Sequence, residues 1–505
     1  MPSASKKTTG SVFLVGAGPG DPGLITLRGI ECLRRADVVM FDYLVNSVIV
    51  EHAPVSAERI CLGKHGRSRI WPQDEINRRL VELAQAGKQV VRLKGGDPVV
   101  FARGAEEIEA LRQNDIEFEV VPGITAALAA GSYAGIPITH RKLASAVALV
   151  TGHEENDKEA AAVDYAALAA FPGTLVMYMG VTTAPTWTSA LISAGRSAET
   201  PTAIVRRCSL PDQRVIQCTL GEVAEKMTGE NRIRPPAIVI VGEVTTLAST
   251  LSWFDKRPLF GQTIMVTRPL SQASSLASSL AELGANVVVQ PAIAITEPED
   301  WQTVDTAIEQ LDDYEWLVFS STNGVKFFFE RLFKLGHDVR ALGGIQLASV
   351  GPGTADALAK YHLQADITPD DFHAESLSTA LADKARGKRF LLLRASRGRD
   401  VLTDDLRAAG GTVDQVIVYR SLDVERPDVD LAKRLAEGGI DWITVTSSAI
   451  ASSLVQLFGE DLRKSRLASL SPITSNRLRE LGFEPAIEAK IHTMQGLIDA
   501  LLEPE

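Results

Sequence analysis

The order of apolar and polar positions along the chain predicts alternating strands and helices. Short apolar runs that end in glycine, aspartate or proline turns are typical of buried strands, and helix-periodic stretches follow them. Strands are expected at residues 12–15, 38–41, 89–93, 118–121, 146–151, 174–179, 202–205 and 237–241. Helices are expected at residues 24–35 and about 105–114. This alternation predicts an α/β fold for the first half of the chain.

The second half contains an internal repeat. EWLVFSS at residues 315–321 aligns with DWITVTS at residues 441–447, and an apolar helical pattern follows each segment. The hydroxyl side chains could cap those helices. Alternatively, helix N-termini at strand ends could offer free amides to the carboxylates of a ligand. Two similar lobes facing a cleft would bring two such ends to one ligand.

Composition limits the classes of partner. The 505 residues suggest three or four folding units at ~100–200 residues per domain. The net charge of −11 argues against nucleic-acid binding, and an anionic substrate would need locally clustered arginine and lysine. The four cysteines lack CxxC spacing, which favours reduced thiols without a metal. No apolar run reaches the ~18 residues of a membrane span and no signal-peptide pattern is present, so we expect a cytoplasmic protein.

The first glycine-rich turn permits a dinucleotide-binding interpretation. The segment Gly18–Gly23 satisfies GxGxxG after a strand, and Asp42 ends the next strand. Pro19 and Pro22 lack the backbone N–H groups that a pyrophosphate needs in such a turn. An NAD-dependent oxidoreductase fused to a two-lobed ligand-binding module therefore remains only the alternative hypothesis.

A set of ordered motifs gives the first half a different resemblance. The motifs are VGAGPGDPGLITLRG, ADVVMFDYLV, LGKHG, VVRLKGGDPVVFARG, VVPGITAA, GIPITHR and LVTGH. In this order they resemble the tetrapyrrole methylases, and in particular uroporphyrinogen-III C-methyltransferases, over residues 10–254. The resemblance implies S-adenosyl-L-methionine as methyl donor, held between lobes at about 10–152 and 165–254. The donor-binding residues that it implies are Pro19, Gly95, Gly96, Asp97, Val100, Thr125, Ala126, Met179 and Cys208.

The same resemblance assigns roles toward the tetrapyrrole. It implies Asp42 as proton acceptor and Lys64 as proton donor, although each could equally be a solvated charge. Because guanidinium groups bind carboxylates bidentately, several arginines are candidates to hold the substrate. These arginines are Arg28, Arg103, Arg141, Arg206 and Arg207. Gly95 and Gly96 have no Cβ, which lets a ligand approach the backbone closely.

The second half resembles uroporphyrinogen-III synthase from residue 261 to about 502. The segments that carry this resemblance are IMVTRP, VFSSTNGVKFF, ASVGPGTADAL, FLLLRASRGRDVL, VIVYRS, WITVTSSA and IHTMQGLIDAL. The resemblance implies two flavodoxin-like lobes, 261–291 plus 422–505 and 297–418, joined by a two-stranded linker. It implies no cofactor and no metal. The chain departs from the family at ASLSPIT, where a glycine is expected before PIT.

This second resemblance also implies a site. Helix N-termini would hold the substrate carboxylates, because fixed amides bind anions without a charged side chain. The candidates are Ser320, Ser321, Thr322, Asn323, Gly324, Gly351, Gly353, Thr354, Ser396, Arg397, Gly398, Thr446 and Ser447. Tyr419 is the candidate proton donor, or else a buried strand aromatic.

Together the two resemblances predict a bifunctional enzyme of tetrapyrrole biosynthesis. It would cyclise hydroxymethylbilane to uroporphyrinogen III as a lyase and methylate that product twice to precorrin-2, on the siroheme and cobalamin branch. Residues 1–9 are expected to be a disordered tail and residues 255–260 a linker between the two enzymes. We expect small-molecule tetrapyrrole substrates, no nucleic-acid or membrane partner, and a homodimer formed through the methyltransferase half.

Overall fold

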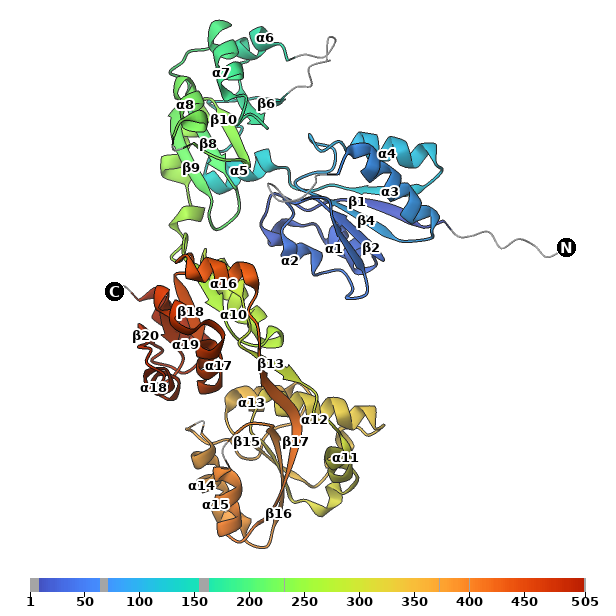
Figure 1. The fold of residues 1–505 in the computed structure, drawn as a ribbon, viewed down its shortest axis with the longest axis vertical. Helices are drawn as coiled ribbons and strands as arrows, with labels where there is room; N and C mark the ends of the chain where they lie inside the picture. Colours follow the sequence, from blue (N-terminus) through green and yellow to red (C-terminus); the bar gives the residue numbers. More distant parts are fainter. Residues whose placement is uncertain are drawn as a thin grey trace, which may run out of the picture. The chain divides into compact units, whose positions relative to one another are not determined.

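The computed structural model describes residues 9–63, 71–153, 163–230, 232–371, 373–398 and 400–503. The chain divides into two compact units (Figure 1). The first unit comprises residues 1–262 with 281–286, and the second comprises residues 263–280 with 287–505. Each unit contains two β-sheets covered by helices, so the predicted α/β fold class is confirmed.

The first sheet of the first unit has the strand order β3-β2-β4-β1-β5, and all of its pairings are parallel. Its strands are β1 Ser11–Gly16, β2 Val38–Phe41, β3 Glu58–Cys61, β4 Val90–Lys94 and β5 Glu117–Val121. Its helices are α1 Leu27–Arg34, α2 Ser47–Val50, α3 Gln73–Gln85 and α4 Gly104–Gln113. Helices α1 and α2 pack on one face and α3 and α4 on the other (Figure 1), so the central strands are apolar on both sides.

The first helix begins later than the sequence predicts. A short 3₁₀ turn occupies Pro22–Leu24, and α1 starts only at Leu27, after Thr26 accepts a hydrogen bond from the N–H of Gly29 at 3.1 Å. The side chain of Thr26 therefore caps the helix, and the glycine motif ends before it. This geometry differs from a dinucleotide site, in which the glycine turn opens directly into the helix.

The second sheet of the first unit has the order β6-β7-β10-β8-β9. Strands β6 and β7 are parallel, whereas β10 runs antiparallel to β7 and β8, and β9 runs antiparallel to β8. The strands are β6 Val147–Thr151, β7 Thr174–Tyr178, β8 Pro201–Arg206, β9 Arg214–Thr219 and β10 Ala237–Val241. The helices are α5 Ala126–Ala134, α6 Tyr165–Ala170, α7 Ala184–Ser193, α8 Val223–Thr228 and α9 Ala248–Leu251. Most of residues 153–164, between the two expected lobes, lies outside the described residues.

One sheet of the second unit has the order β12-β11-β18-β19-β20. Its strands are β11 Thr263–Val266, β12 Asn286–Val289, β18 Trp442–Val445, β19 Arg466–Ser469 and β20 Ile487–Glu488. The helices around it are α10 Leu270–Glu282, α16 Val429–Ala436, α17 Ser448–Phe458, α18 Pro472–Glu480 and α19 Met494–Leu502. In chain order this is the 2-1-3-4-5 arrangement of flavodoxin-like folds.

The other sheet of the second unit has the order β13-β17-β16-β14-β15. Its strands are β13 Ile293–Thr296, β14 Trp316–Phe319, β15 Gln346–Ser349, β16 Arg389–Ala395 and β17 Thr412–Asp423. Its helices are α11 Gln302–Glu309, α12 Thr322–Lys334, α13 Pro352–Ala359, α14 Ala374–Ala385 and α15 Val401–Ala408. The long strand β17 pairs in parallel with β16 and continues as an antiparallel pair with β13. That pair forms the two-stranded connection between the sheets (Figure 1).

The repeat in the sequence corresponds to a repeated structural device. Glu315 accepts a hydrogen bond from the N–H of Arg389 at 2.8 Å, and Asp441 accepts one from the N–H of Thr263 at 2.7 Å. In each case the acidic residue before a strand anchors the start of the neighbouring strand. Ser471 occupies the position where a family glycine was expected. Its φ of −159° is extended backbone open to any residue, so it caps α18 without strain.

Candidate active sites

Three loops meet at the carboxyl edge of the first sheet, where β1, β4 and β5 end. Gly18 and Gly96 exchange backbone hydrogen bonds of 3.1 and 2.8 Å. A Cβ on Gly123 would lie 2.2 Å from the carbonyl oxygen of Gly96, and a Cβ on Gly16 would lie 2.5 Å from the Cα of Gly123. Glycine at 16 and 123 is therefore required by the close approach of one loop to another.

Gly95 and Gly96 are glycines in a different setting. A Cβ on Gly95 would meet no protein atom closer than 3.6 Å, and a Cβ on Gly96 none closer than 3.8 Å. A Cβ at either position would therefore make only ordinary van der Waals contacts with the protein. Because no Cβ stands over these peptides, the loop fits a ligand that approaches the peptide groups themselves.

Asp97 connects two of these loops. Its side chain is buried and accepts hydrogen bonds from the N–H of Val99 at 2.9 Å and of Gly123 at 3.0 Å. Each carboxylate oxygen still has acceptor capacity for a ligand donor. Asp97 therefore organises the loop structure in addition to any contact that it makes with a ligand.

Tyr178, at the end of β7, joins several of the predicted donor-site residues. Its hydroxyl lies 2.6 Å from Oγ1 of Thr125 and accepts the N–H of Ala127 at 2.8 Å. Its ring packs on Phe101 with a centroid distance of 4.9 Å. The next residue, Met179, has a φ of 51° and is 49% exposed. A non-glycine residue in this region is strained, and such strain is concentrated at functional sites. No sequence motif marks Tyr178, because it has the pattern of an ordinary residue at the end of a buried strand.

The turn after β8 brings Cys208 to this group. Its thiol is buried and donates to the carbonyl oxygen of Ala126 at 3.8 Å, and burial raises the pKa of the thiol to about 12. The preceding Arg206 and Arg207 both pair with Asp212, at 3.9 and 2.7 Å. The structure thus gathers Thr125, Ala126, Met179 and Cys208, while Pro19 and Val100 are half-buried on the loops after β1 and β4.

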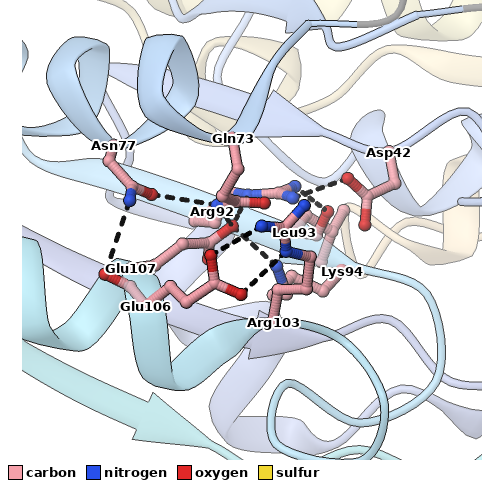
Figure 2. Close-up of polar contacts among 9 residues, drawn as sticks. All are labelled: Asp42, Gln73, Asn77, Arg92, Leu93, Lys94, Arg103, Glu106 and Glu107. Carbon is pink, nitrogen blue, oxygen red and sulfur yellow. Dashed lines mark hydrogen bonds and ion pairs between the residues drawn. The ribbon is translucent and has the colours of Figure 1, made fainter. Parts of the chain in front are cut away.

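Asp42 lies at the end of β2, beside a cluster of buried charges (Figure 2). Its Oδ1 accepts a hydrogen bond of 2.6 Å from Nη2 of Arg92, whose Nε donates to Oε1 of Glu107 at 3.1 Å. Lys94 donates to the same Glu107 oxygen at 2.7 Å. Burial opposes the charge of Arg92, but the two carboxylates outweigh it and hold its pKa above the ordinary value. The predicted proton donor Lys64 lies outside the described residues.

Two of the remaining candidate arginines are paired with protein carboxylates. Arg28 donates to Glu119 at 2.6 Å across the surface of the first lobe, and Arg103 pairs with Glu106 at 2.7 Å. Arg141 is exposed and has no ion pair with another described residue. To receive a substrate carboxylate, Arg28 and Arg103 would have to exchange one carboxylate partner for another.

In the second unit Tyr419 meets the N-terminus of α12. Its hydroxyl lies 3.0 Å from Oγ of Ser321, which caps the helix by accepting the N–H of Gly324 at 3.0 Å. The Tyr419 ring is buried and stacks on Phe327 at 5.8 Å. Burial raises the pKa of the phenol. Tyr419 is thus both a core aromatic and a hydroxyl that contacts a capped helix end.

The other predicted synthase residues lie at strand ends and helix starts. Ser447 caps α17 by accepting the N–H of Ile450 at 3.2 Å, and Arg397 pairs with Asp423 at 2.8 Å. The rest are found at the ends of β14, β15, β16 and β18 or in the first turn of the following helix: Ser320, Thr322, Asn323, Gly351, Gly353, Thr354, Ser396, Gly398 and Thr446.

Arg268 and Gln272 were not singled out by the sequence analysis. Arg268 follows β11, and its Nη2 donates to Oε1 of Gln272 at 2.8 Å. Gln272 in turn donates to Oδ1 of Asn323 at 2.9 Å. Within the described ranges Arg268 makes no ion pair with a carboxylate, and burial lowers its pKa. The signal in the sequence was the arginine of IMVTRP, which was used only to identify the family.

The solved structures that match parts of this chain include uroporphyrin-III C-methyltransferases and a uroporphyrinogen III synthase. A uroporphyrin-III C-methyltransferase from Thermus thermophilus is 41% identical, with a TM-score of 0.41, and covers 47% of this chain and 94% of its own. A second structure of that kind, at 42% identity, was determined with S-adenosyl homocysteine, covers 47% of this chain and 100% of its own, and has a TM-score of 0.41. A mutant uroporphyrinogen III synthase from Thermus thermophilus is 17% identical, with a TM-score of 0.37, and covers 48% of this chain and 97% of its own.

Sequence comparisons cover both halves. The family model for tetrapyrrole (corrin/porphyrin) methylases matches residues 11–224, and the model for uroporphyrinogen-III synthase HemD matches residues 274–499. A porphyrin biosynthesis protein HemD of Ruminiclostridium josui is 37% identical over 98% of both chains. A uroporphyrinogen-III C-methyltransferase of Bacillus subtilis is 38% identical over 66% of this chain and 68% of its own. A siroheme synthase of Zymomonas mobilis is 48% identical, but the match spans only 49% of this chain and 52% of that relative. The chain therefore belongs to the tetrapyrrole-biosynthesis family that joins a tetrapyrrole methylase to a uroporphyrinogen-III synthase.

Proposed function

We propose that the first unit methylates uroporphyrinogen III twice to precorrin-2, and that the second unit makes uroporphyrinogen III from hydroxymethylbilane. The observation that carries this proposal is the full-length similarity to a porphyrin-biosynthesis relative, at 37% identity over 98% of both chains. It is supported by open glycine loops in the first unit and capped helix ends in the second. The product would enter the siroheme or cobalamin branch.

The donor would lie against the loops at the carboxyl edge of the first sheet. S-adenosylmethionine supplies the methyl group of the reaction, and a relative of the first unit was solved with S-adenosyl homocysteine. The residues that would hold the donor are Pro19, Gly95, Gly96, Asp97, Val100, Thr125, Ala126, Met179 and Cys208. The free space at Gly95 and Gly96 supports this assignment, because a nucleoside could contact the bare peptide groups.

Asp42 would accept the proton that the substrate loses around the methylated carbon. Its side chain is 32% exposed and accepts a charge-assisted hydrogen bond of 2.6 Å from Arg92. A partly exposed carboxylate at a strand end can reach a bound substrate, whereas the buried side chains of Arg92, Lys94 and Glu107 cannot. Lys64 as proton donor stays a prediction.

The second unit would bind the carboxylates of hydroxymethylbilane at helix N-termini. Ser321 and Ser447 each use their hydroxyl for one N–H, which leaves other first-turn amides for the ligand. Arg268, which has no carboxylate partner among the residues that the structure describes, would add a guanidinium. Tyr419 would protonate the departing hydroxyl, so that the C–O bond breaks and water leaves. A pyrrole carbon would then form the ring-closing C–C bond, and the proton that this carbon loses would return to the phenolate of Tyr419.

The arrangement of the whole protein also stays a proposal. Residues 255–260 would join two enzymes that fold independently, and the first unit would form a homodimer. Within the described ranges no helix has the length and apolar character needed to cross a membrane.

The test is a coupled reaction with the purified full chain. Hydroxymethylbilane alone should give the type III isomer of uroporphyrinogen. Addition of methyl-labelled S-adenosylmethionine should then place two labels in the macrocycle, as measured by mass spectrometry. A type I product would contradict the synthase assignment, and an unlabelled type III product would contradict the methyltransferase assignment. A rise in melting temperature with NAD but not with S-adenosyl homocysteine would favour the oxidoreductase alternative.

A further inference from the structure

Three buried charged side chains, those of Arg92, Lys94 and Glu107, form a cluster with the partly exposed Asp42 (Figure 2). Arg92 and Lys94 are two residues apart on β4, so their side chains leave the same face of the strand. Glu107 on α4 receives both cations through its Oε1, at 3.1 and 2.7 Å. The cluster holds two cations and two carboxylates, and three of the four side chains are at most 3% exposed.

The cluster is a costly way to fill a protein interior. Glu107 is completely buried, and its Oε2 has no hydrogen-bond partner, although its Oε1 also accepts Nε2 of Gln73 at 3.2 Å. Burial lowers the pKa of the Lys94 ammonium, and the charge of Arg92 adds to this effect. Buried ion pairs of this kind are often no more stabilising than apolar residues of the same volume. Stability alone therefore gives a poor account of these residues.

The guanidinium of Arg92 is fixed on three sides. Its Nε donates to Glu107 at 3.1 Å, its Nη1 to the carbonyl oxygen of Leu93 at 3.2 Å, and its Nη2 to Oδ1 of Asp42 at 2.6 Å. Within the described residues, the other oxygen of Asp42, Oδ2, has no hydrogen-bond partner. Arg92 therefore holds Oδ1 of Asp42 from the buried side, a contact called the clamp below, and Oδ2 can accept a hydrogen bond from a ligand.

We propose that Arg92, held in place by Glu107, is a positioning residue that orients the Asp42 carboxylate for methylation. The inference rests on the proposed role of Asp42 as proton acceptor. Lys94 is also part of the arrangement. It neutralises the negative charge of Glu107, so the positive charge of Arg92 remains available to Asp42. Since the clamp acts on the geometry of the acceptor and not on the donor loops, its loss should lower kcat and leave donor affinity unchanged.

The primary variant is Arg92→Gln in the full chain. It removes the clamp but leaves Lys94 and Glu107 as a neutral pair, so no buried charge loses its only partner. We expect kcat for methylation of uroporphyrinogen III to fall about 10- to 100-fold, with KM and the dissociation constant of S-adenosyl homocysteine within about twofold of wild type. Arg78→Gln is the matched control, because it breaks an exposed Arg–Glu82 pair on α3 in the same lobe and should not change kcat.

A second measurement distinguishes the positioning role of Arg92 from the proposed role of Asp42 as proton acceptor. Asp42→Asn should lower kcat, and the double variant with Arg92→Gln should be no slower than Asp42→Asn alone, because Arg92 acts through Asp42. The positioning role would be overturned if the kcat losses of the two single variants multiply in the double variant. It would also be overturned if Arg92→Gln keeps wild-type kcat while Asp42→Asn is impaired. A fully active Asp42→Asn enzyme would instead remove the proposed role of Asp42.

Folding failure of Arg92→Gln would not end the test. Arg92→Lys keeps the positive charge, but a lysine ammonium lacks the planar guanidinium that donates to Asp42 and Glu107 at the same time. We therefore expect kcat between those of wild type and the Asp42→Asn variant. Glu107→Gln removes the anchor while Lys94, with its lowered pKa, can shed its proton. We expect it to lower kcat with unchanged affinity for S-adenosyl homocysteine. Wild-type kcat in both folded variants would refute the proposal.

Discussion

Substitution by alanine should lower stability at one glycine of the candidate donor site and ligand affinity at another. Gly123→Ala would place a Cβ 2.2 Å from the backbone oxygen of Gly96, whereas Gly95→Ala would meet nothing closer than 3.6 Å. The first contact involves backbone and can be relieved only if a loop moves. The second substitution fits the protein itself and intrudes only on the space assigned to the donor.

The magnitudes follow from that geometry. Forced overpacking costs about 1–3 kcal/mol, so Gly123→Ala should lower the melting temperature of the first unit by roughly 2–12 °C at about 2–4 °C per kcal/mol. Gly95→Ala should stay within about 0.5 kcal/mol of wild-type stability. If the donor contacts the peptide at Gly95, the added methyl should weaken S-adenosyl homocysteine binding at least tenfold, or about 1.4 kcal/mol.

The assay combines two calorimetric measurements on the full chain. Because two units can unfold separately, the transition of the first unit is identified as the one that S-adenosyl homocysteine shifts upward. Isothermal titration gives the dissociation constant for each variant. A Gly95→Ala protein that binds S-adenosyl homocysteine like wild type would refute the assignment of that space. A Gly123→Ala protein of unchanged stability would refute the packing argument.

Three further predictions concern the remaining groups. Tyr419→Phe retains the stacking on Phe327 but removes a hydroxyl, so it should cost about 1 kcal/mol of stability and reduce formation of the type III isomer at least tenfold; an unchanged synthase rate would exclude Tyr419 as proton donor. Burial raises the pKa of Cys208 to about 12, so about a thousandfold less of it should be thiolate at pH 8 than of an ordinary thiol. Mass spectrometry that shows rapid alkylation of Cys208 in the native protein would contradict this. Separate expression of residues 1–257 and 258–505 should give two folded proteins with one activity each, and aggregation of either would argue against a linker at the junction.

The parts of the fold that the sequence predicted are those built from uninterrupted apolar runs. Strands β1 and β2 have apolar runs because both faces of a parallel sheet are covered by helices. Strand β3, Glu58–Cys61, was missed because it is a half-exposed edge strand that begins with two charged residues. Strand β9, Arg214–Thr219, was missed for a similar reason, since it is an edge strand whose sequence RVIQCT has no apolar run longer than two residues.

The candidate site could be predicted only where its chemistry lies in a local motif. Gly95 and Gly96 stand in one short segment and were found from it. Glu107 was missed because it reads as one of three glutamates in GAEEIEALRQ, which is typical of a solvated helix face. Its position shows a weak signal in retrospect, since it lies three residues after buried Gly104 and four before buried Leu111 on one helical stripe. Contacts such as that of Tyr178 with Thr125 join distant segments and carry no local pattern.

The charge of the chain sets a physical limit on how a polyanionic substrate can be held. The net charge is −11, and Arg28, Arg103 and Arg397 are already paired to protein carboxylates, so these three cannot gain a carboxylate on binding without losing one. Exchanging one carboxylate for another yields little net electrostatic energy, because both states have a neutralised cation. Helix-end amides do not have this limitation, since they are neutral, fixed and otherwise hydrated. Arg141 and Arg268 have no ion pair among the described residues, so each could add a whole charge. Each should contribute more to the affinity for its own substrate than the paired arginines do.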